Sequence, residues 1–174
     1  AGAFNSVNYG TLTIQPSLLA NLGTTEQVLV TTGAPTNTAL TGGDILTVPS
    51  IFIALAGVGQ DANFTRYDAG TGFREHSVTT VATLGTTAAT NVGDIVAADT
   101  VGAAPNDIID IAALRMSANV DSFDGSQLLR INNGGLIFNG ATASGLNVNT
   151  LFGTGTGASL TEALVYVRDG QTGI

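Results

Sequence analysis

Apolar clusters recur at intervals of about 18 residues along the C-terminal part of the chain, centred near Ile111, Leu129, Val148 and Val165. Residues rich in glycine and asparagine separate them. A repeat of roughly 20 residues with a short strand in each copy is typical of a β-solenoid, whose stacked coils bury one continuous apolar column. Glycine and asparagine suit its corners because they adopt turn conformations at low cost. The spacing therefore predicts a parallel β-helix.

An antiparallel β-sandwich is the alternative, because it also combines short strands with glycine-rich turns. The segment Asn132-Asn133-Gly134-Gly135 lies between two apolar runs and would form a plausible hairpin turn. In a β-helix the amides of Asn132 and Asn133 would instead belong to an asparagine ladder along the stacked coils. Both architectures are all-β, and the repeat favours the parallel one.

The residue usage excludes a mainly helical protein. The chain contains no lysine and only three glutamates, Glu26, Glu75 and Glu162, whereas surface helices usually carry both types on their solvent face. Threonine and valine are abundant and favour strands. Residues 108–118 are apolar on nearly every side and would fit a short helix or a strand, and the neighbouring context favours a strand.

The charge and the missing residue types exclude several function classes. Five arginines against thirteen carboxylates give a net charge of −8, so there is no basic surface for a nucleic acid. Without cysteine, disulfides and thiolate metal sites cannot form. No apolar run approaches the roughly 18 residues of a membrane helix, so no transmembrane segment is expected. We also expect no cofactor.

We expect residues 1–174 to form a single β-solenoid segment. Short strands are predicted at 11–14, 27–31, 44–48, 51–55 and 73–78. Residues 82–106 are dominated by alanine, threonine and glycine, and they predict a loop or a boundary between an N-terminal and a C-terminal part. Ten apolar residues are expected to point inward: Ile111, Leu114, Leu129, Ile131, Leu136, Phe138, Val148, Leu151, Val165 and Val167.

The order of several short blocks over residues 38–174 resembles that of bacterial autotransporter-associated β-strand repeat proteins. These blocks are Gly42-Gly43-Asp44-Ile45-Leu46, Phe64-Thr65-Arg66-Tyr67-Asp68, Gly72-Phe73-Arg74, and residues 107–116, 128–138 and 162–170. Residues 48–52 depart from the family, which often has a tryptophan-containing step there.

The resemblance implies a right-handed, surface-exposed β-helix of which this chain is one piece. Its implied function is a non-enzymatic structural or adhesive segment of an exported bacterial protein, located outside the cell or at its surface. The implied partners are a continuation of the same polypeptide, further copies that assemble end to end into a filament, or surface glycans. Alternative functions are a β-helix enzyme acting on polysaccharides, a lyase or hydrolase, and a carbohydrate-binding sandwich module.

Three aromatic residues, Phe64, Tyr67 and Phe73, are the candidate ligand-contact residues. Clustered aromatic rings can stack on a sugar, and they equally well pack in a core. The lone histidine, His76, has no neighbouring nucleophile motif such as G-x-S-x-G, which favours a structural role.

The remaining polar motifs predict no catalytic, cofactor or metal site. In a strand, Asp107 and Asp110 point to opposite faces, so they do not converge with Arg115 as an acid/base pair would. The turn at residues 121–125 lacks the acidic alternation of a calcium loop, and its aspartates suit side-chain bonds within the turn. The glycine-rich run 153–157 lacks the lysine and the following helix of a nucleotide loop.

Overall fold

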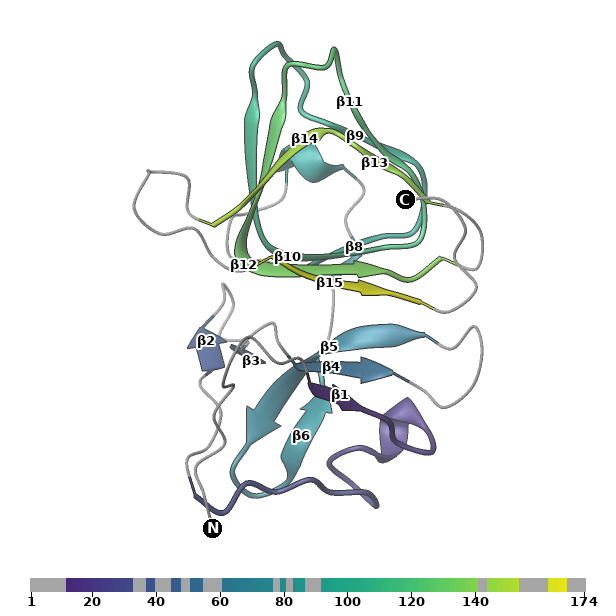
Figure 1. Cartoon of the computed structure of the whole chain (residues 1–174), viewed down its shortest axis with the longest axis vertical. Coiled ribbons are helices and arrows are strands. Elements are labelled where there is room, and N and C mark those ends of the chain that lie inside the picture. The colour runs from purple at the N-terminus through teal and green to yellow at the C-terminus, as the bar shows by residue number, and fades with distance from the viewer. Residues whose placement is uncertain are drawn as a thin grey trace. The chain divides into compact units, whose positions relative to one another are not determined.

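The computed structural model describes residues 12–32, 37–39, 45–47, 51–54, 61–76, 79–80, 83–86, 92–140, 144–153 and 163–168. In these residues the chain is all-β, and its helical content is two short 3₁₀ turns, η1 (Leu19–Asn21) and η2 (Leu84–Thr86). The chain forms two compact units, Ala1–Ser77 and Val78–Ile174 (Figure 1). The all-β prediction is confirmed.

The N-terminal unit contains a four-stranded sheet in the order β1-β4-β5-β6. Its strands are β1 (Leu12–Ile14), β4 (Ile51–Ala54), β5 (Ala62–Asp68) and β6 (Gly72–Glu75). The β1–β4 pair is parallel, whereas β4–β5 and β5–β6 are antiparallel. A second antiparallel pair joins β2 (Asn37–Ala39) to β3 (Ile45–Thr47). This unit therefore differs from the single solenoid expected over residues 1–174.

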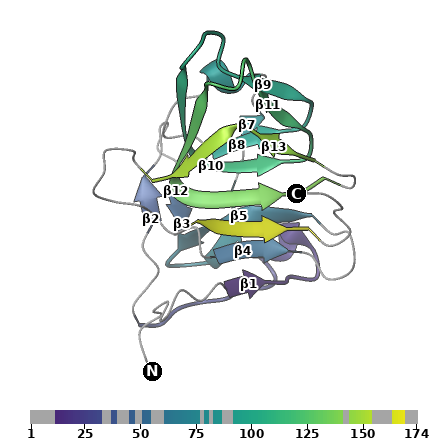
Figure 2. The ribbon, with the colours of Figure 1, turned by 45° about the horizontal axis from the view of Figure 1, so that its top comes forward.

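The C-terminal unit is built from parallel strand pairs. Its strands are β7 (Thr79–Thr80), β8 (Val92–Ile95), β9 (Asp99–Val101), β10 (Ile108–Met116), β11 (Val120–Ser122), β12 (Leu128–Phe138), β13 (Leu146–Asn147), β14 (Asn149–Phe152) and β15 (Leu164–Val167). One sheet has the order β14-β12-β10-β8-β7, with β15 also on β12, and the other has the order β13-β11-β9. Figure 2 shows β12, β10 and β8 side by side.

Most successive layers of this unit are offset by 20 to 22 residues, whereas the pairs Val120–Leu146 and Gly135–Leu164 have offsets of 26 and 29. Ile111 pairs with Ile131, and Ile131 pairs with Phe152, so the repeat is about 20 to 22 residues long. The predicted interval of 18 residues was too short, and its centres do not share one column. Leu129 pairs with Ile109 rather than Ile111. The strands of this unit follow a three-sided outline in Figure 1.

Strand β12 runs through the segment that the sandwich alternative treats as a hairpin turn. In the pairing with β10, Ile131 lies opposite Ile111. The next paired residue of β12 is Gly135, which lies opposite Ala113. Residues 132–134 therefore form a bulge that absorbs two extra residues within one strand. In the amide orientation that satisfies its neighbours, the Asn132 side-chain nitrogen donates to Asp110 Oδ1 and to the Gly153 carbonyl oxygen, both at 3.3 Å. The hairpin prediction for this segment is wrong.

The division between the units falls after Ser77, and part of the region expected as a loop is ordered strand. Residues 92–95 form β8 and residues 99–101 form β9, both in the C-terminal unit. Val92, Ile95 and Val101 are buried there. These few apolar residues are scattered among alanine, threonine and glycine, so the sequence shows too little alternation to reveal the strands.

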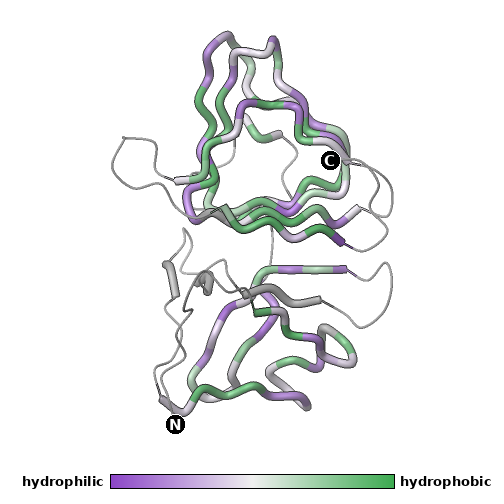
Figure 3. The backbone as a smooth tube through the Cα atoms, viewed as in Figure 1, coloured by the Kyte–Doolittle hydropathy of each residue, from purple (hydrophilic) through white to green (hydrophobic). Residues whose placement is uncertain are grey.

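The C-terminal core is one apolar cluster that includes six of the ten residues predicted to point inward. Its buried members are Leu84, Ile95, Val101, Ile111, Leu114, Met116, Val120, Leu129, Ile131, Leu136 and Phe138. Val148 and Val167 pack against it while partly exposed, and Leu151 is also partly buried. Figure 3 shows hydrophobic stretches along these strands, with hydrophilic residues between them.

Val165 contradicts the inward prediction, because its side chain is 49% exposed. It pairs with Leu136, a core residue, and therefore shares that residue's face of the sheet. Among the described residues, β15 pairs with β12 alone, so no further strand stacks on its other edge. Val165 is in register with a core residue, but it lies in the last described strand of this sheet, so no described strand covers it.

Candidate functional site

The three aromatic residues proposed to contact a ligand lie inside the N-terminal unit. Tyr67 and Phe73 are paired across β5 and β6, with ring centroids 4.9 Å apart and planes at 68°. The Tyr67 hydroxyl accepts a bond from Val30 N (2.9 Å) and donates to Val30 O (3.2 Å). Phe64 is on the opposite face of β5, since it is three residues from Tyr67. All three side chains are buried, so the structure places them in the core rather than on a sugar-binding surface.

His76 is also an interior residue. Its backbone N–H donates to Phe64 O (2.9 Å), and its carbonyl accepts from the Asn63 amide (3.1 Å). The same Asn63 nitrogen donates to Glu75 Oε1 (2.7 Å). The histidine side chain is buried, which fits the structural role predicted for it.

An acid/base site for polysaccharide cleavage would need Asp107, Asp110 and Arg115 to converge. In the structure each of them makes a separate contact. Asp107 Oδ2 accepts bonds from two backbone amides of the turn that precedes it, both at 2.8 Å. Asp110 forms an ion pair with Arg130 of the next layer. Arg115 forms an ion pair with Asp94 of the preceding layer (2.7 Å). In this arrangement each group stabilises a corner or a strand pair of the fold.

The turn at residues 121–125 is stabilised by its own side chains. Asp124 Oδ1 accepts bonds from Ser126 N (2.9 Å) and Ser126 Oγ (2.5 Å), which is an Asx turn. The Ser126 hydroxyl bond, followed by the Ser126 backbone bond, holds the pKa of Asp124 below its usual value. Asp121 Oδ1 accepts from the Asn147 amide of the next layer (2.7 Å). Of the glycine-rich run 153–157, only Gly153 lies within the described residues.

A buried glutamine, which the sequence did not single out, joins two successive corners of the C-terminal unit. The Gln127 amide nitrogen donates to Ala104 O and to Asp124 Oδ1, both at 2.8 Å. Its oxygen accepts from Ser122 Oγ (2.5 Å) and Asp124 N (3.0 Å). Because the side chain is completely buried and bonded at both ends, it fixes the corner after β11 onto the corner after β9.

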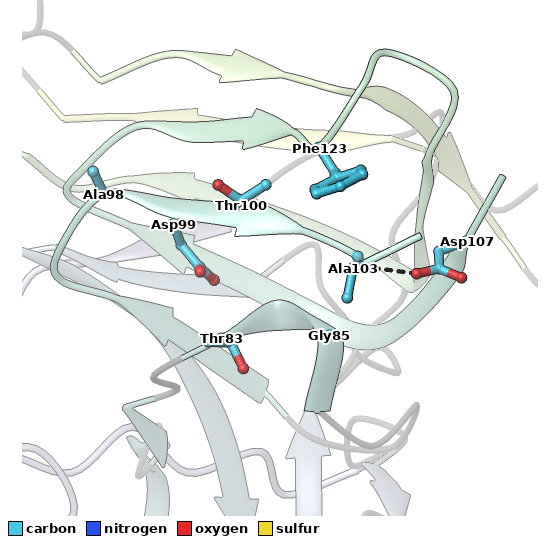
Figure 4. Close-up of a pocket in the computed structure, with 9 residues that line it drawn as sticks. Thr83, Gly85, Ala98, Asp99, Thr100, Ala103, Asp107 and Phe123 are labelled. Atoms are coloured by element: carbon cyan, nitrogen blue, oxygen red, sulfur yellow. Dashed lines mark hydrogen bonds between the residues drawn. The ribbon is translucent and has the colours of Figure 1, made fainter. Parts of the chain in front are cut away.

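The C-terminal unit contains a cleft of about 560 Å³ along strand β9 (Figure 4). One wall is β9 and the corner that follows it, and another is the 3₁₀ turn η2. The lining residues are Thr83, Gly85, Ala98, Asp99, Thr100, Gly102, Ala103, Asp107 and Phe123. A volume of this size falls in the range of roughly 300–1,000 Å³ that ligand sites occupy. The cleft is the candidate functional site.

The chemistry of the cleft is acidic with one aromatic wall. Asp99 Oδ2 accepts a bond from Leu84 N (2.7 Å), which fixes η2 against β9. The Oδ2 atom of Asp107 accepts a hydrogen bond from Ala103 N in the adjacent corner. Phe123 is 52% exposed, and no arginine lines the cleft. The sequence did not reveal this site because its residues come from a stretch of about 40 positions, which the pairing of β9 with β11 and the bond from Leu84 to Asp99 bring together.

Comparison with family models, with curated proteins and with solved structures found no match to this chain. Within the described residues, no helix is both long and apolar enough to cross a membrane. The same residues hold no group of three or more His, Cys, Asp or Glu side chains arranged to bind a metal ion.

Proposed function

We propose that this chain is a non-enzymatic structural or adhesive segment of an exported bacterial repeat protein, located at the cell surface or outside the cell. Its C-terminal unit would be a right-handed parallel β-helix. The observation that carries the proposal is the parallel pairing of β8, β10, β12 and β15 at offsets of about 20 residues or more. Such an offset is what successive coils of a solenoid produce.

The pairing pattern supports a coiled path in two further ways. In both sheets the strands follow one another in reverse chain order, β14-β12-β10-β8-β7 in the larger and β13-β11-β9 in the smaller. The chain therefore alternates between the two sheets as it passes from layer to layer. The expected hand is right-handed, because nearly all crossover connections between parallel strands of one sheet have that hand. Gln127 joins corners of successive layers, and the Asn147–Asp121 contact joins the paired strands β13 and β11, as stacked coils require.

The last described layer suits addition of further strands. Val165 is half exposed on a face that is apolar in the preceding layers. The strand β15 is paired at one edge within the described residues. An uncovered strand edge beside an apolar surface is a template for pairing with another chain or with more of the same chain. We therefore propose that copies associate through this layer.

Sedimentation velocity of the 174-residue chain over a range of concentrations tests this association. We expect species larger than one chain, and we expect Val165→Arg to shift them to the mass of a single chain. Val28→Arg is the matched control, because Val28 is a similarly exposed valine in the N-terminal unit. A single-chain mass at every concentration, or equal effects of both variants, would contradict the proposed association.

The non-enzymatic part of the proposal rests on the roles of the carboxylates. Asp94, Asp110 and Asp124 bind neighbouring layers or turns of the fold. A general acid and base would instead converge on one substrate bond. Incubation with acidic and neutral polysaccharides, followed by assays for reducing ends and unsaturated products, is expected to give no turnover. Product formation that scales with protein concentration would overturn this part.

A further inference from the structure

The first and last layers of the C-terminal unit differ in how far their apolar side chains are covered. In the first layer, Leu84, Val92, Ile95 and Val101 are all buried. In the last layer, the apolar residues of β13, β14 and β15 are only partly buried or are exposed. They are Leu146, Leu151, Phe152, Leu164, Val165, Tyr166 and Val167. Within the described residues, the apolar column is therefore closed at one end and open at the other.

Short segments cover the strands of the first layer on the side away from the later layers. Strand β7 pairs with β8, which has β10 on its other edge. The 3₁₀ turn η2 contacts β9, whose other edge is paired with β11. Leu84 N of this turn donates to Asp99 Oδ2 (2.7 Å), and the Leu84 side chain belongs to the core cluster. Figure 1 shows this turn, in teal, inside the three-sided outline. Turn η2 therefore caps this end of the unit.

The last layer leaves one edge of β15 available. Arg168 N donates to Phe138 O, the residue that follows Ile137 in β12 (2.9 Å). Backbone groups of successive residues in a strand point to alternate edges, so Val165 and Val167 direct their N–H and C=O groups away from β12. No strand of the described residues pairs with this edge. The layer therefore offers backbone hydrogen-bonding groups beside an apolar surface.

The open layer also lacks negative charge. Its described residues, 144–153 and 163–168, contain no aspartate or glutamate, although the whole chain has thirteen carboxylates and a net charge of −8. Arg168 is the one charged residue in these ranges, and its Nη1 donates to Asn139 O (2.9 Å). The first layer, by contrast, carries Asp94 and Asp99. Two copies of this acidic chain therefore repel each other least when their last layers meet.

We infer that the last layer binds the last layer of a second copy, and that the resulting pair is a closed dimer with two-fold symmetry. This inference rests on the association proposed above and adds its partner surface and its size limit. Two copies of β15 related by a two-fold axis would run antiparallel along their free edges. A filament would need the last layer to bind the first layer of the next copy, where η2 already covers β9. The cap therefore stops assembly at two chains.

Sedimentation velocity of the 174-residue chain at rising concentrations tests the size limit. We expect the mass to rise from one chain to two chains and then to stay constant. Species that keep growing beyond two chains would overturn the closed dimer but leave the association through this layer intact. A single-chain mass at every concentration would contradict the association itself, and the dimer with it.

Capture of the untagged parent chain by tagged variants tests which surfaces meet. In the closed dimer, the arginine of Val165→Arg would lie against a parent layer whose described residues offer no carboxylate. We expect this variant to capture at least about tenfold less parent chain than Val28→Arg, which changes the N-terminal unit and leaves the last layer unaltered.

Head-to-tail contact predicts a different result in the same experiment. The first layer of Val165→Arg is unaltered, so this variant could still bind the last layer of a parent chain. It would then capture the parent to within a factor of about two of Val28→Arg, because one of its two binding ends remains. Capture within that factor would overturn the two-fold contact. Failure of Val28→Arg to capture the parent would instead contradict the association through the last layer.

Discussion

The Arg115 guanidinium forms two bonds with the Asp94 carboxylate, from Nε to Oδ1 (2.9 Å) and from Nη2 to Oδ2 (2.7 Å). The two residues are register partners in adjacent parallel strands, β10 and β8. Their side chains are only 17% and 7% exposed. A fork-shaped, largely buried pair of this kind joins two layers of the C-terminal unit and specifies their register.

Arg115→Met should destabilise the chain by about 3 kcal/mol or more, because it leaves the buried Asp94 carboxylate without its charged partner. Arg130→Met is the matched control, since the Arg130–Asp110 pair has the same spacing between layers but side chains 22% and 25% exposed. Its loss should cost less, about 1–2 kcal/mol, because water reaches the Asp110 carboxylate more easily than that of Asp94. Urea unfolding followed by circular dichroism measures both. Equal costs would show that burial does not decide the strength of these pairs.

Replacing Leu129 and Val165 should have very different consequences, although both were predicted to point inward. Leu129→Ala should cost about 2–5 kcal/mol because the side chain is completely buried in the core cluster. Val165→Ala should cost about 0.5 kcal/mol or less, since the valine is half exposed. Thermal unfolding of dilute samples, in which association is weakest, provides the comparison. A large loss for Val165→Ala under these conditions would show that another layer covers it.

Gly102 and Gly125 occupy equivalent corners but should differ in their tolerance of a side chain. Both have a positive φ, +74° and +86°. A Cβ atom at Gly102 would lie 2.9 Å from both Asp107 Cβ and Gln127 Cγ, whereas a Cβ at Gly125 meets nothing within 4 Å.

Gly125→Ala should therefore cost only the strain of the left-handed conformation, about 1–2 kcal/mol. Gly102→Ala should cost clearly more, because it also displaces Gln127, which joins two corners. Denaturant midpoints of the two variants provide the measurement. If both lose the same stability, the close contacts at Gly102 do not constrain the corner.

Asp124 should contribute to the loss of stability in acid. Its pKa is lowered in the folded chain by the Ser126 hydrogen bonds, so the fold favours the ionised form. The resulting stabilisation is complete above the unfolded pKa of about 4 and disappears as the pH falls through the lower folded value.

Asp124→Asn should be less stable than the parent chain at neutral pH, and the difference should shrink below about pH 4. Urea unfolding at a series of pH values measures this difference. A constant difference at every pH would show that the lost hydrogen-bond geometry, rather than the charge, is responsible.

The local sequence determined that the chain would be all-β, and it located the long strands of the C-terminal unit. Apolar residues dominate 108–116 and both ends of 128–138, and this property belongs to each segment by itself. Glycine and asparagine marked several corners for the same local reason. The role of the aromatic residues was harder to predict. From the sequence, Phe64, Tyr67 and Phe73 fit a sugar-binding surface as well as a core, and the structure buries all three.

Only the tertiary structure decided which strands stack and which groups meet. The bulge at residues 132–134 sets the register of β12, and the Asp94–Arg115 pair and the cleft join residues from separate layers. These relationships depend on the free energy of pairing distant segments, which no local pattern encodes. Leu129 and Val165 illustrate the limit: each has apolar neighbours in its own strand, but only Leu129 has described strands on both sides.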